Sequence, residues 1–317
     1  MDKVLLFLKG LAMGAADVVP GVSGGTIAFI SGIYEELLES IDKVNLSVLK
    51  TWKTNGFKAA WRSINGGFLL TLFTGIAVSI LSLAKAIKWL LTNEPILLWS
   101  FFFGLVLASI FYIGKQIKSW NIIVILALIL STVVSYFITI AEPFASPDSN
   151  LYLLFCGFVA IIAMILPGVS GAFILLILGA YQTAIDTVNQ LSDGLATLDF
   201  NILKDAMVKF LMLAIGAIIG LKTFSRILNW MFKHHKNLTL TILTGFMIGS
   251  LNKIWPWKNV LSWRINSHNE KVPLLEESIS PFSYPEDNQL IMAIILMVVG
   301  FLTIFVLERL GQNESTN

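Results

Sequence analysis

Long apolar runs separated by short polar segments dominate the chain. Six of them are close to the roughly 20 residues that a transmembrane helix needs, and they cover residues 66–84, 95–113, 121–140, 207–224, 237–254 and 289–307. Two more apolar segments, 4–34 and 151–181, are each broken near the middle by a Pro-Gly pair. The arms beside each break have about 15 residues, or roughly 22 Å of helix, too short for a hydrocarbon core about 30 Å thick. The pattern predicts six transmembrane helices and two re-entrant helical hairpins, each of which returns to the side it entered.

The two broken segments carry the same motif. Residues 19–25 read VPGVSGG, and residues 166–172, which lie 147 positions later, read LPGVSGA. At a nearby offset of 141, Gly75 aligns with Gly216 and Gly104 with Gly245. These matches indicate a duplication, with a first repeat at 1–145, a second at 146–310 and a polar tail at 311–317.

Each repeat holds one hairpin and three spans, and an odd number of crossings turns the second copy upside down relative to the first. The sequence therefore predicts an all-α polytopic membrane protein built as an inverted repeat. With the N-terminus inside, fourteen of the 22 Lys and Arg residues fall on the inner side, which agrees with the positive-inside rule.

The chemistry of the two breaks suits an anion. Non-helical backbone at bilayer depth persists only where protein or a water-filled cavity satisfies its polar groups. Small residues allow a ligand to approach the backbone, and the arm after each break presents free N–H groups and a positive dipole end. We predict that the paired tips bind an anion through Pro20, Gly21, Ser23, Gly24, Gly25 and Thr26 in the first copy and Pro167, Gly168, Ser170 and Gly171 in the second. For Gly216/Gly220 and Gly245/Gly249, close helix packing is the favoured interpretation.

Four charged residues near the predicted site are candidates for coupling or gating. Asp17 lies three residues before Pro20, where an ionised carboxylate is costly, and Met164 takes its place in the second copy. Asp17 either couples transport to a proton or Na⁺ or accepts hydrogen bonds from the neighbouring tip. Lys85 and its repeat equivalent Arg226 would lie toward opposite faces, as gates or as interfacial snorkelling side chains. Glu35 either receives a cation or belongs to a solvated helix end.

Composition restricts the class of protein further. With 56% hydrophobic and 13% charged residues and a mean hydropathy of +0.78, the chain is predicted to be a multi-pass membrane protein. A net charge of +2 gives no reason to expect a nucleic-acid partner. The single cysteine, Cys156, excludes an intramolecular disulfide, and His234/His235 lack the partners of a metal site, so we expect no cofactor. No cleavable signal is evident, and the first helix is expected to remain. Residues 46–64 interleave aromatic and basic residues, as expected of an interfacial helix facing anionic lipids.

The tract from Met13 to Thr26, MGAADVVPGVSGGT, together with LPGVSG at 166–171, resembles the signature of the DUF368 family of membrane proteins, which includes polyprenyl-phosphate translocases. The resemblance spans essentially the whole chain. It implies a translocase that returns undecaprenyl phosphate, or a related polyprenyl phosphate, from the outer to the inner leaflet of the bacterial cytoplasmic membrane. It also implies that the anion at the tips is the lipid phosphate.

Two other functions remain open from the sequence. Undecaprenyl-pyrophosphate phosphatases also carry Pro-Gly-x-Ser hairpins, but there an arginine follows the serine, whereas glycine follows Ser23 and Ser170. Without a cation in the loop to stabilise a phosphoryl-transfer transition state, we expect a translocase rather than an enzyme. A transporter for small anions such as phosphate or sulfate is the second alternative. The chain has no nucleotide-binding Gly-x-x-x-x-Gly-Lys-Ser/Thr loop, which argues against direct drive by ATP.

Overall fold

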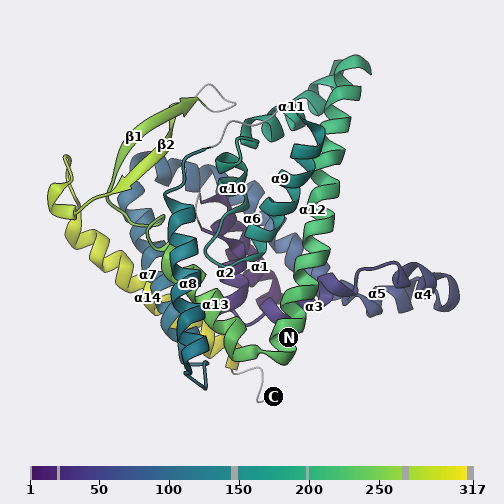
Figure 1. The fold of residues 1–317 in the computed structure, drawn as a ribbon, viewed down its shortest axis with the longest axis horizontal. Helices are drawn as coiled ribbons and strands as arrows, with labels where there is room; N and C mark the ends of the chain where they lie inside the picture. Colours follow the sequence, from purple (N-terminus) through teal and green to yellow (C-terminus); the bar gives the residue numbers. More distant parts are fainter. Residues whose placement is uncertain (1, 20–21, 144–148, 198–199, 266–270, 313–317) are drawn as a thin grey trace.

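The computed structural model describes residues 2–19, 22–143, 149–197, 200–265 and 271–312, which fold into a mostly helical body (Figure 1). The first half contains α1 (Lys3–Val18), α2 (Gly24–Ile30), α3 (Tyr34–Lys43), α4 (Ser47–Asn55), α5 (Phe57–Ser63), α6 (Gly66–Asn93), α7 (Pro95–Gly114) and α8 (Ile122–Thr139). The second half contains α9 (Asn150–Ile165), α10 (Gly171–Ile177), α11 (Tyr181–Thr197), α12 (Phe200–His234), α13 (Lys236–Ser250), β1 (Lys258–Ile265), β2 (Lys271–Ser278), a 3-10 turn (Pro281–Ser283) and α14 (Leu290–Gln312).

The helices of the two halves pack in corresponding pairs. α1 packs on α6 in the first half, and the corresponding helices of the second half, α9 and α12, pack in the same way. The other two pairs join the halves: α7 packs on α14, and α13, the counterpart of α7, packs on α8. Glycines lie at these crossings: a Cβ on Gly75 would meet a backbone oxygen of α1 at 2.4 Å, and a Cβ on its counterpart Gly216 would meet one of α9 at 1.9 Å. Gly220, Gly245 and Gly249 are equally close to backbone atoms of a neighbouring helix, which confirms the packing interpretation for those pairs.

Both broken segments double back on themselves, but their second arms are shorter than the sequence predicted. α1 and α9 have 16 residues each, whereas α2 and α10 have only seven. The second arms end just before Gly32 (φ +74°) and Gly179 (φ +68°). Positive φ is a conformation that glycine adopts readily and other residues rarely adopt. Lys9 Nζ donates to Ser31 O at 2.8 Å, and Tyr152 Oη donates to Leu178 O at 2.8 Å. The end of each second arm is thereby bound to the first arm.

The two hairpins start at opposite ends of the body. The start of α1 and the described end of α14 lie at one end, called the terminal end below, whereas α9 starts at the other end (Figure 1). Among the described residues, four helices are long and apolar enough to cross a membrane: Gly66–Leu83, Pro95–Gly114, Ile122–Thr139 and Leu203–His234. They match four of the six predicted spans. α14 is apolar over its described part, and α13, predicted to extend to 254, has only 15 residues and is largely buried.

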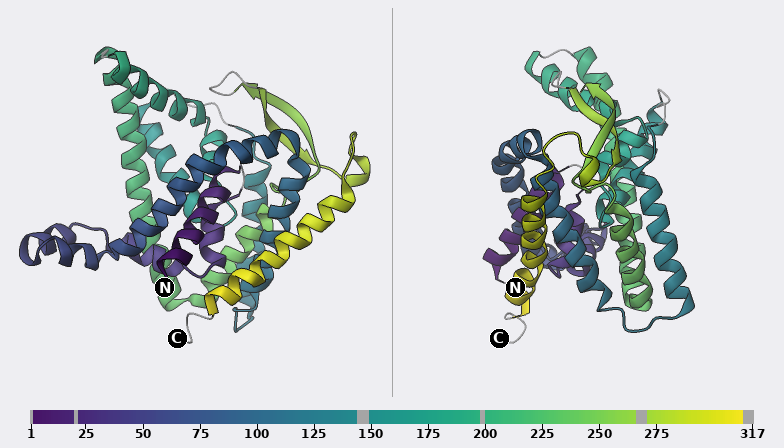
Figure 2. Two further views of the ribbon diagram at one scale, coloured as in Figure 1. Left: turned by 180° about the vertical axis from the view of Figure 1, so that it is seen from behind. Right: turned by 90° about the vertical axis from the view of Figure 1, so that its left-hand side faces the viewer.

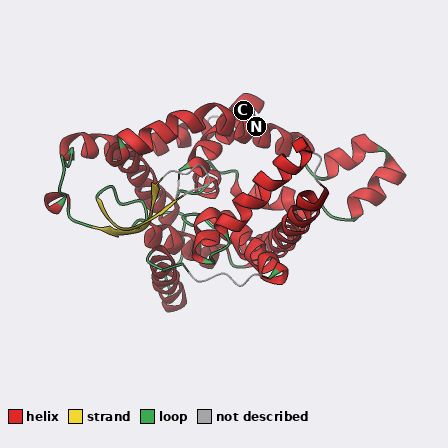
Figure 3. Ribbon diagram, turned by 90° about the horizontal axis from the view of Figure 1, so that it is seen from above, coloured by secondary structure: helices red, strands yellow, loops and turns green. Residues whose placement is uncertain are grey.

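The prediction of an all-α fold is wrong for the connection between α13 and α14. β1 and β2 form an antiparallel hairpin at the end opposite the termini, and they are the only strands among the described residues (Figure 3). Along β1 the side chains alternate with the period of two that a strand requires. Leu261 and Trp263 face outward and are 59% and 48% exposed, whereas Ser262 and Arg264 face the body. The same alternation is visible in the sequence and indicates a strand, although it is much weaker than the pattern of the longer apolar runs.

α4 and α5 form an arm that projects from the body at the side of α3 (Figure 2). Leu46, Trp52 and Phe57 on this arm are 84%, 54% and 65% exposed. Apolar side chains exposed beside lysines fit the predicted interfacial segment, which stays a prediction.

Candidate functional site

Each tip forms where a proline ends the first arm. The residue before a proline disfavours helical geometry, and Val19 (φ −86°, ψ 118°) and Leu166 (φ −66°, ψ 127°) are accordingly extended. Ser23 and Ser170 are also extended and occupy the N-cap positions of α2 and α10. The described residues on both sides of the break therefore have the same conformation in the two copies. Two of the predicted site residues, Pro20 and Gly21, lie outside the described residues.

The amides of the first tip are bonded within the protein. Asp17 Oδ1 accepts a hydrogen bond from Gly24 N at 2.6 Å. Ser23 Oγ accepts one from Gly25 N at 3.1 Å, as an N-cap serine does. The Asp17 carboxylate thus occupies the position at which an external anion would meet the Gly24 amide.

The second tip lacks both of these bonds. Met164 stands at the position of Asp17, and the Ser170 side chain does not cap α10. Within the part of the chain that the structure describes, the amides of Gly171 and Ala172 have no acceptor. Donors at the start of a helix that lack an acceptor favour an anion. The two copies of the motif therefore differ in chemistry although their backbones match.

The structure brings the two tips into direct contact. Gly168 N donates to Thr26 Oγ1 at 2.9 Å, and Ser23 Oγ donates to Met164 O at 3.2 Å. Beside them, the buried Tyr34 hydroxyl donates to Ile165 O at 2.9 Å. The hydroxyls of Ser23 and Thr26, which the sequence suggested as ligand donors, therefore connect the hairpins. Gly168 has a φ of +87°, so glycine is required at this contact.

The expected open space at two of the tip glycines is filled by protein. A Cβ on Gly24 would lie 2.5 Å from the Asp17 carboxylate, and a Cβ on Gly171 would lie 2.7 Å from Ala160 O. These glycines permit close packing of each tip against its own first arm. A side chain at either position would disturb the fold as well as any ligand.

The other predicted charged residues lie away from the tip contacts. Lys85 on α6 and Arg226 on α12 are exposed, and no contact between them and the tips occurs among the described residues. Glu35 forms an exposed ion pair with Lys236, with Oε1 and Nζ 2.7 Å apart. Of the four candidates for coupling or gating, the structure brings only Asp17 into the tip region. No group of three or more His, Cys, Asp or Glu residues in the described ranges could hold a metal ion.

Two cavities lie at opposite ends of α8 and α13, and tip residues line neither of them. One, of about 810 Å³, lies at the terminal end and is lined by basic residues that include Lys115, Lys118, His234, His235 and Lys236. The other, of about 320 Å³, lies at the opposite end between the β-hairpin and the ends of α8, α10 and α13. We call this second space the outer cavity.

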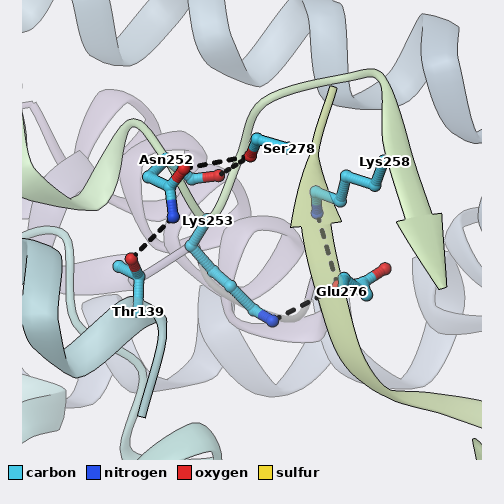
Figure 4. Close-up of polar contacts among 6 residues, drawn as sticks. All are labelled: Thr139, Asn252, Lys253, Lys258, Glu276 and Ser278. Carbon is cyan, nitrogen blue, oxygen red and sulfur yellow. Dashed lines mark hydrogen bonds and ion pairs between the residues drawn. The ribbon is translucent and has the colours of Figure 1, made fainter. Parts of the chain in front are cut away.

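A charged cluster that sequence reasoning missed borders the outer cavity (Figure 4). Glu276 Oε2 on β2 lies 3.2 Å from Lys253 Nζ and 3.6 Å from Lys258 Nζ. Next to this cluster, Asn252 Nδ2 donates to Thr139 Oγ1 at 2.9 Å. The three charged residues are up to 23 positions apart in the sequence. The pairing of β1 with β2 places Lys258 near Glu276, and Lys253 comes from the turn after α13. In the sequence, only the alternation of side chains along β1 indicates that such a cluster can form.

Comparisons with known proteins identify relatives over almost the whole chain. A family model described as VCA0040-like, undecaprenyl phosphate translocase-like, matches residues 13–272. A Vibrio cholerae protein named polyprenyl-phosphate transporter is 46% identical over 316 residues, which is 98% of each chain. A Staphylococcus aureus protein of the same name is 29% identical over 278 residues, covering 83% of this chain and 91% of the relative. No solved structure matches the chain. Both relatives are named as transporters, in agreement with the expectation of a translocase rather than an enzyme.

Proposed function

The chain belongs to the undecaprenyl phosphate translocase-like family, and from this premise we propose that it carries undecaprenyl phosphate or a related polyprenyl phosphate from the outer to the inner leaflet of the bacterial cytoplasmic membrane. The observation that carries this proposal is the 46% identity to a polyprenyl-phosphate transporter over 98% of both chains. A carrier of such a lipid must give a polar path to one phosphate, while the prenyl tail can remain in the bilayer. Two polar breaks that meet inside an apolar body are suited to that task.

In this proposal the two halves are inverted repeats and the terminal end faces the cytoplasm. The corresponding helix pairs, α1 with α6 and α9 with α12, support the duplication. Hairpins that start at opposite ends support the inversion (Figure 1). Each hairpin then re-enters from its own side, and the tips meet between the two leaflets.

We further propose that the phosphate binds at the paired tips and is held first by the second tip. The amides of Gly171 and Ala172 and the Ser170 hydroxyl are donors available to phosphate oxygens there. At the first tip, the Asp17 carboxylate must leave Gly24 N before a phosphate can bind to that amide. Release of Asp17, by protonation or by Na⁺, would couple movement of the phosphate from one tip to the other to an ion.

The decisive experiment is a leaflet-resolved assay of undecaprenyl phosphate. Cells depleted of their own translocases should accumulate the lipid in the outer leaflet, and expression of this chain should return it to the inner leaflet. A Ser170→Ala variant should restore less transport, while Ser82→Ala, which removes an exposed hydroxyl bonded only to its own helix, serves as the control. Unchanged accumulation after expression of the wild-type chain would contradict the proposal. Release of phosphate from undecaprenyl pyrophosphate by purified protein would indicate an enzyme instead.

A further inference from the structure

The cluster beneath the β-hairpin contains more cations than carboxylates. Lys253 and Lys258 share one oxygen of Glu276, and the side chains of the three residues are only 15%, 8% and 21% exposed. Arg264, also on the inner face of β1, adds a third cation and lies 4.7 Å from the ring centre of Tyr181 on α11. A charge held away from water without a full counter-charge is costly. The region under the hairpin therefore favours one more anion.

The inner face of β1 presents three poorly paired polar atoms, Lys258 Nζ, Ser262 Oγ and Arg264 Nε. All three atoms are buried, and within the described residues Ser262 Oγ and Arg264 Nε have no hydrogen-bond partner, while Lys258 Nζ has only the ion pair with Glu276 at 3.6 Å. Lys258 Nζ lies 4.0 Å from the ring centre of Trp99 on α7, a cation–π contact that compensates only part of the lost hydration. Burial lowers the pKa of Lys258 from 10.5 to about 8, although the nearby Glu276 carboxylate acts in the opposite direction. None of these three residues lines the outer cavity, so the charge of Lys258 and Arg264 acts from behind it on an anion bound at Lys253.

The outer cavity has a polar end and an apolar wall. Lys253, Asn252 and Ser278 lie at the polar end, beside Glu276 (Figure 4). The apolar wall is formed by Tyr136, Ile140, Phe173, Leu176 and Leu274, and the exposed Leu261, at the irregularity in β1, also borders the cavity. Glu142 and Glu277 also line the cavity, but both are exposed, so water and salt screen their charge. A phosphate joined to an apolar chain matches this division.

The outer cavity also adjoins the second hairpin. Lys253 Nζ lies 4.6 Å from the ring centre of Phe173, which is two residues after Gly171 on α10. A group bound to Lys253 is therefore close to the helix whose first amides lack acceptors. The Glu276 carboxylate already forms ion pairs with Lys253 and Lys258, and an incoming anion would bind at the same position.

We propose that the outer cavity is a receiving site for a phosphomonoester headgroup, in which the phosphate binds Lys253 and displaces Glu276 from it. This inference rests on the proposed function and adds a binding site separate from the paired tips. Lys258 and Arg264 provide positive charge behind the site, and the first isoprene units contact the apolar wall. Glu276 serves as the counter-charge while the site is empty of lipid.

The test measures binding of undecaprenyl phosphate to the purified full-length protein by ligand-induced thermal stabilisation. Undecaprenol and inorganic phosphate are the comparison ligands. Lys253→Gln should weaken binding of undecaprenyl phosphate on the order of tenfold, since a charge-assisted contact is lost. Glu276→Gln should tighten binding severalfold, because the competing carboxylate is removed. Lys271→Gln removes an exposed lysine of the same hairpin, whose Nζ lies 4.9 Å from the ring centre of Trp263, and should change nothing.

The opposite signs of the two effects separate a ligand site from a structural ion pair. If Lys253→Gln and Glu276→Gln shift the affinity in the same direction or not at all, while the wild type binds the lipid, the receiving site is refuted and the proposed function stands. If the wild type neither binds nor transports undecaprenyl phosphate, the proposed function itself fails. If Lys253→Gln does not fold, two other variants keep the test decisive. The site is supported if Lys253→Arg retains the affinity for undecaprenyl phosphate and Glu276→Gln raises it. If inorganic phosphate stabilises the protein as strongly as undecaprenyl phosphate does, the site binds free phosphate, and the assignment to the lipid is overturned.

Discussion

Asp17 and Met164 occupy equivalent positions in two copies of one motif, and this single difference gives the tips different chemistry. The Asp17 carboxylate takes the Gly24 amide at 2.6 Å, whereas no side chain from the position of Met164 reaches the Gly171 amide. A duplicated backbone with one added carboxylate suits a carrier whose two half-sites must alternate. A symmetric pair would hold the anion equally well at both ends of its path.

We predict that Asp17→Asn folds normally but transports without the dependence on pH or ions seen in the wild type. The asparagine oxygen can still accept the hydrogen bond from Gly24 N, so the tip should retain its structure. The neutral side chain cannot bind or release a proton. Lipid return measured across a range of external pH checks this, and parallel profiles of similar height in both proteins would show that Asp17 only braces the loop.

Lys258 predicts a pH effect on stability. Its pKa is about 8 in the folded protein, because burial opposes its charge, against 10.5 for an unfolded chain. Between these two values the unfolded state binds more protons, so the free energy of unfolding should rise with pH across this window. The rise is at most about 3.5 kcal/mol, since one pKa unit corresponds to about 1.4 kcal/mol. The facing charges are Glu276 and Lys253; burial opposes ionisation of Glu276, but the two lysines outweigh it and lower the pKa of that carboxyl from its usual value.

The measurement compares thermal unfolding of the purified wild type with that of Lys258→Gln at pH 7.5 to 10. Only the difference between the two proteins reports on this lysine, because other groups titrate in the same range. The wild type should gain stability relative to the variant as the pH rises. A constant difference would mean that Lys258 keeps an ordinary pKa in the folded state.

At the level of single residues, the sequence identified the polar tips but not the bonds that their side chains make. The motif marked Ser23, Thr26 and Ser170 as hydroxyl donors of similar use. Their roles diverge because Ser23 and Thr26 meet backbone atoms of the other half, more than 140 positions away. Contacts of that range depend on how the helices pack, and periodicity along one chain carries no information about them.

At the level of elements, Thr26 provides one of the hydrogen bonds between the two hairpins. We predict that Thr26→Val destabilises the protein by about 1 kcal/mol and reduces transport more than it reduces folded protein. The valine has the same shape but leaves Gly168 N without its acceptor at 2.9 Å. Thr74→Val is the matched control, because the Thr74 hydroxyl is exposed and bonds only within its own helix. Equal transport by the two variants at equal expression would show that the tips need not be joined.

The elements that the sequence missed are those whose form depends on short-range turn chemistry. The second arms stop after seven residues, and Gly32 and Gly179 follow them with positive φ, whereas the sequence predicted arms of about 15 residues. The β-hairpin was missed because it lies between two predicted spans, where only the period of two along β1 indicates a strand. The long spans were found because hydrophobic length alone determines them.

At the scale of the whole molecule, the helix pairs, the tips and the cavities follow one arrangement. The tips meet inside the body, the outer cavity lies at one end and the basic cavity lined by Lys115 and Lys236 lies at the other. A lipid phosphate that travels between the two ends would pass cationic side chains at both and backbone donors between them. This arrangement requires that the two hairpins open toward opposite sides of the membrane, which labelling can test directly.

We predict that Thr54→Cys reacts only from the cytoplasm and Gln190→Cys only from outside the cell. Both positions are exposed, on α4 and α11, which follow the first and the second hairpin. The single native cysteine, Cys156, is buried, so labelling can be read against a low background. A membrane-impermeant maleimide added to intact cells should therefore label Gln190→Cys, and Thr54→Cys should be labelled only after the cells are opened. If both cysteines react from the same side, three crossings do not separate the hairpins, and the inverted arrangement fails together with the path that depends on it.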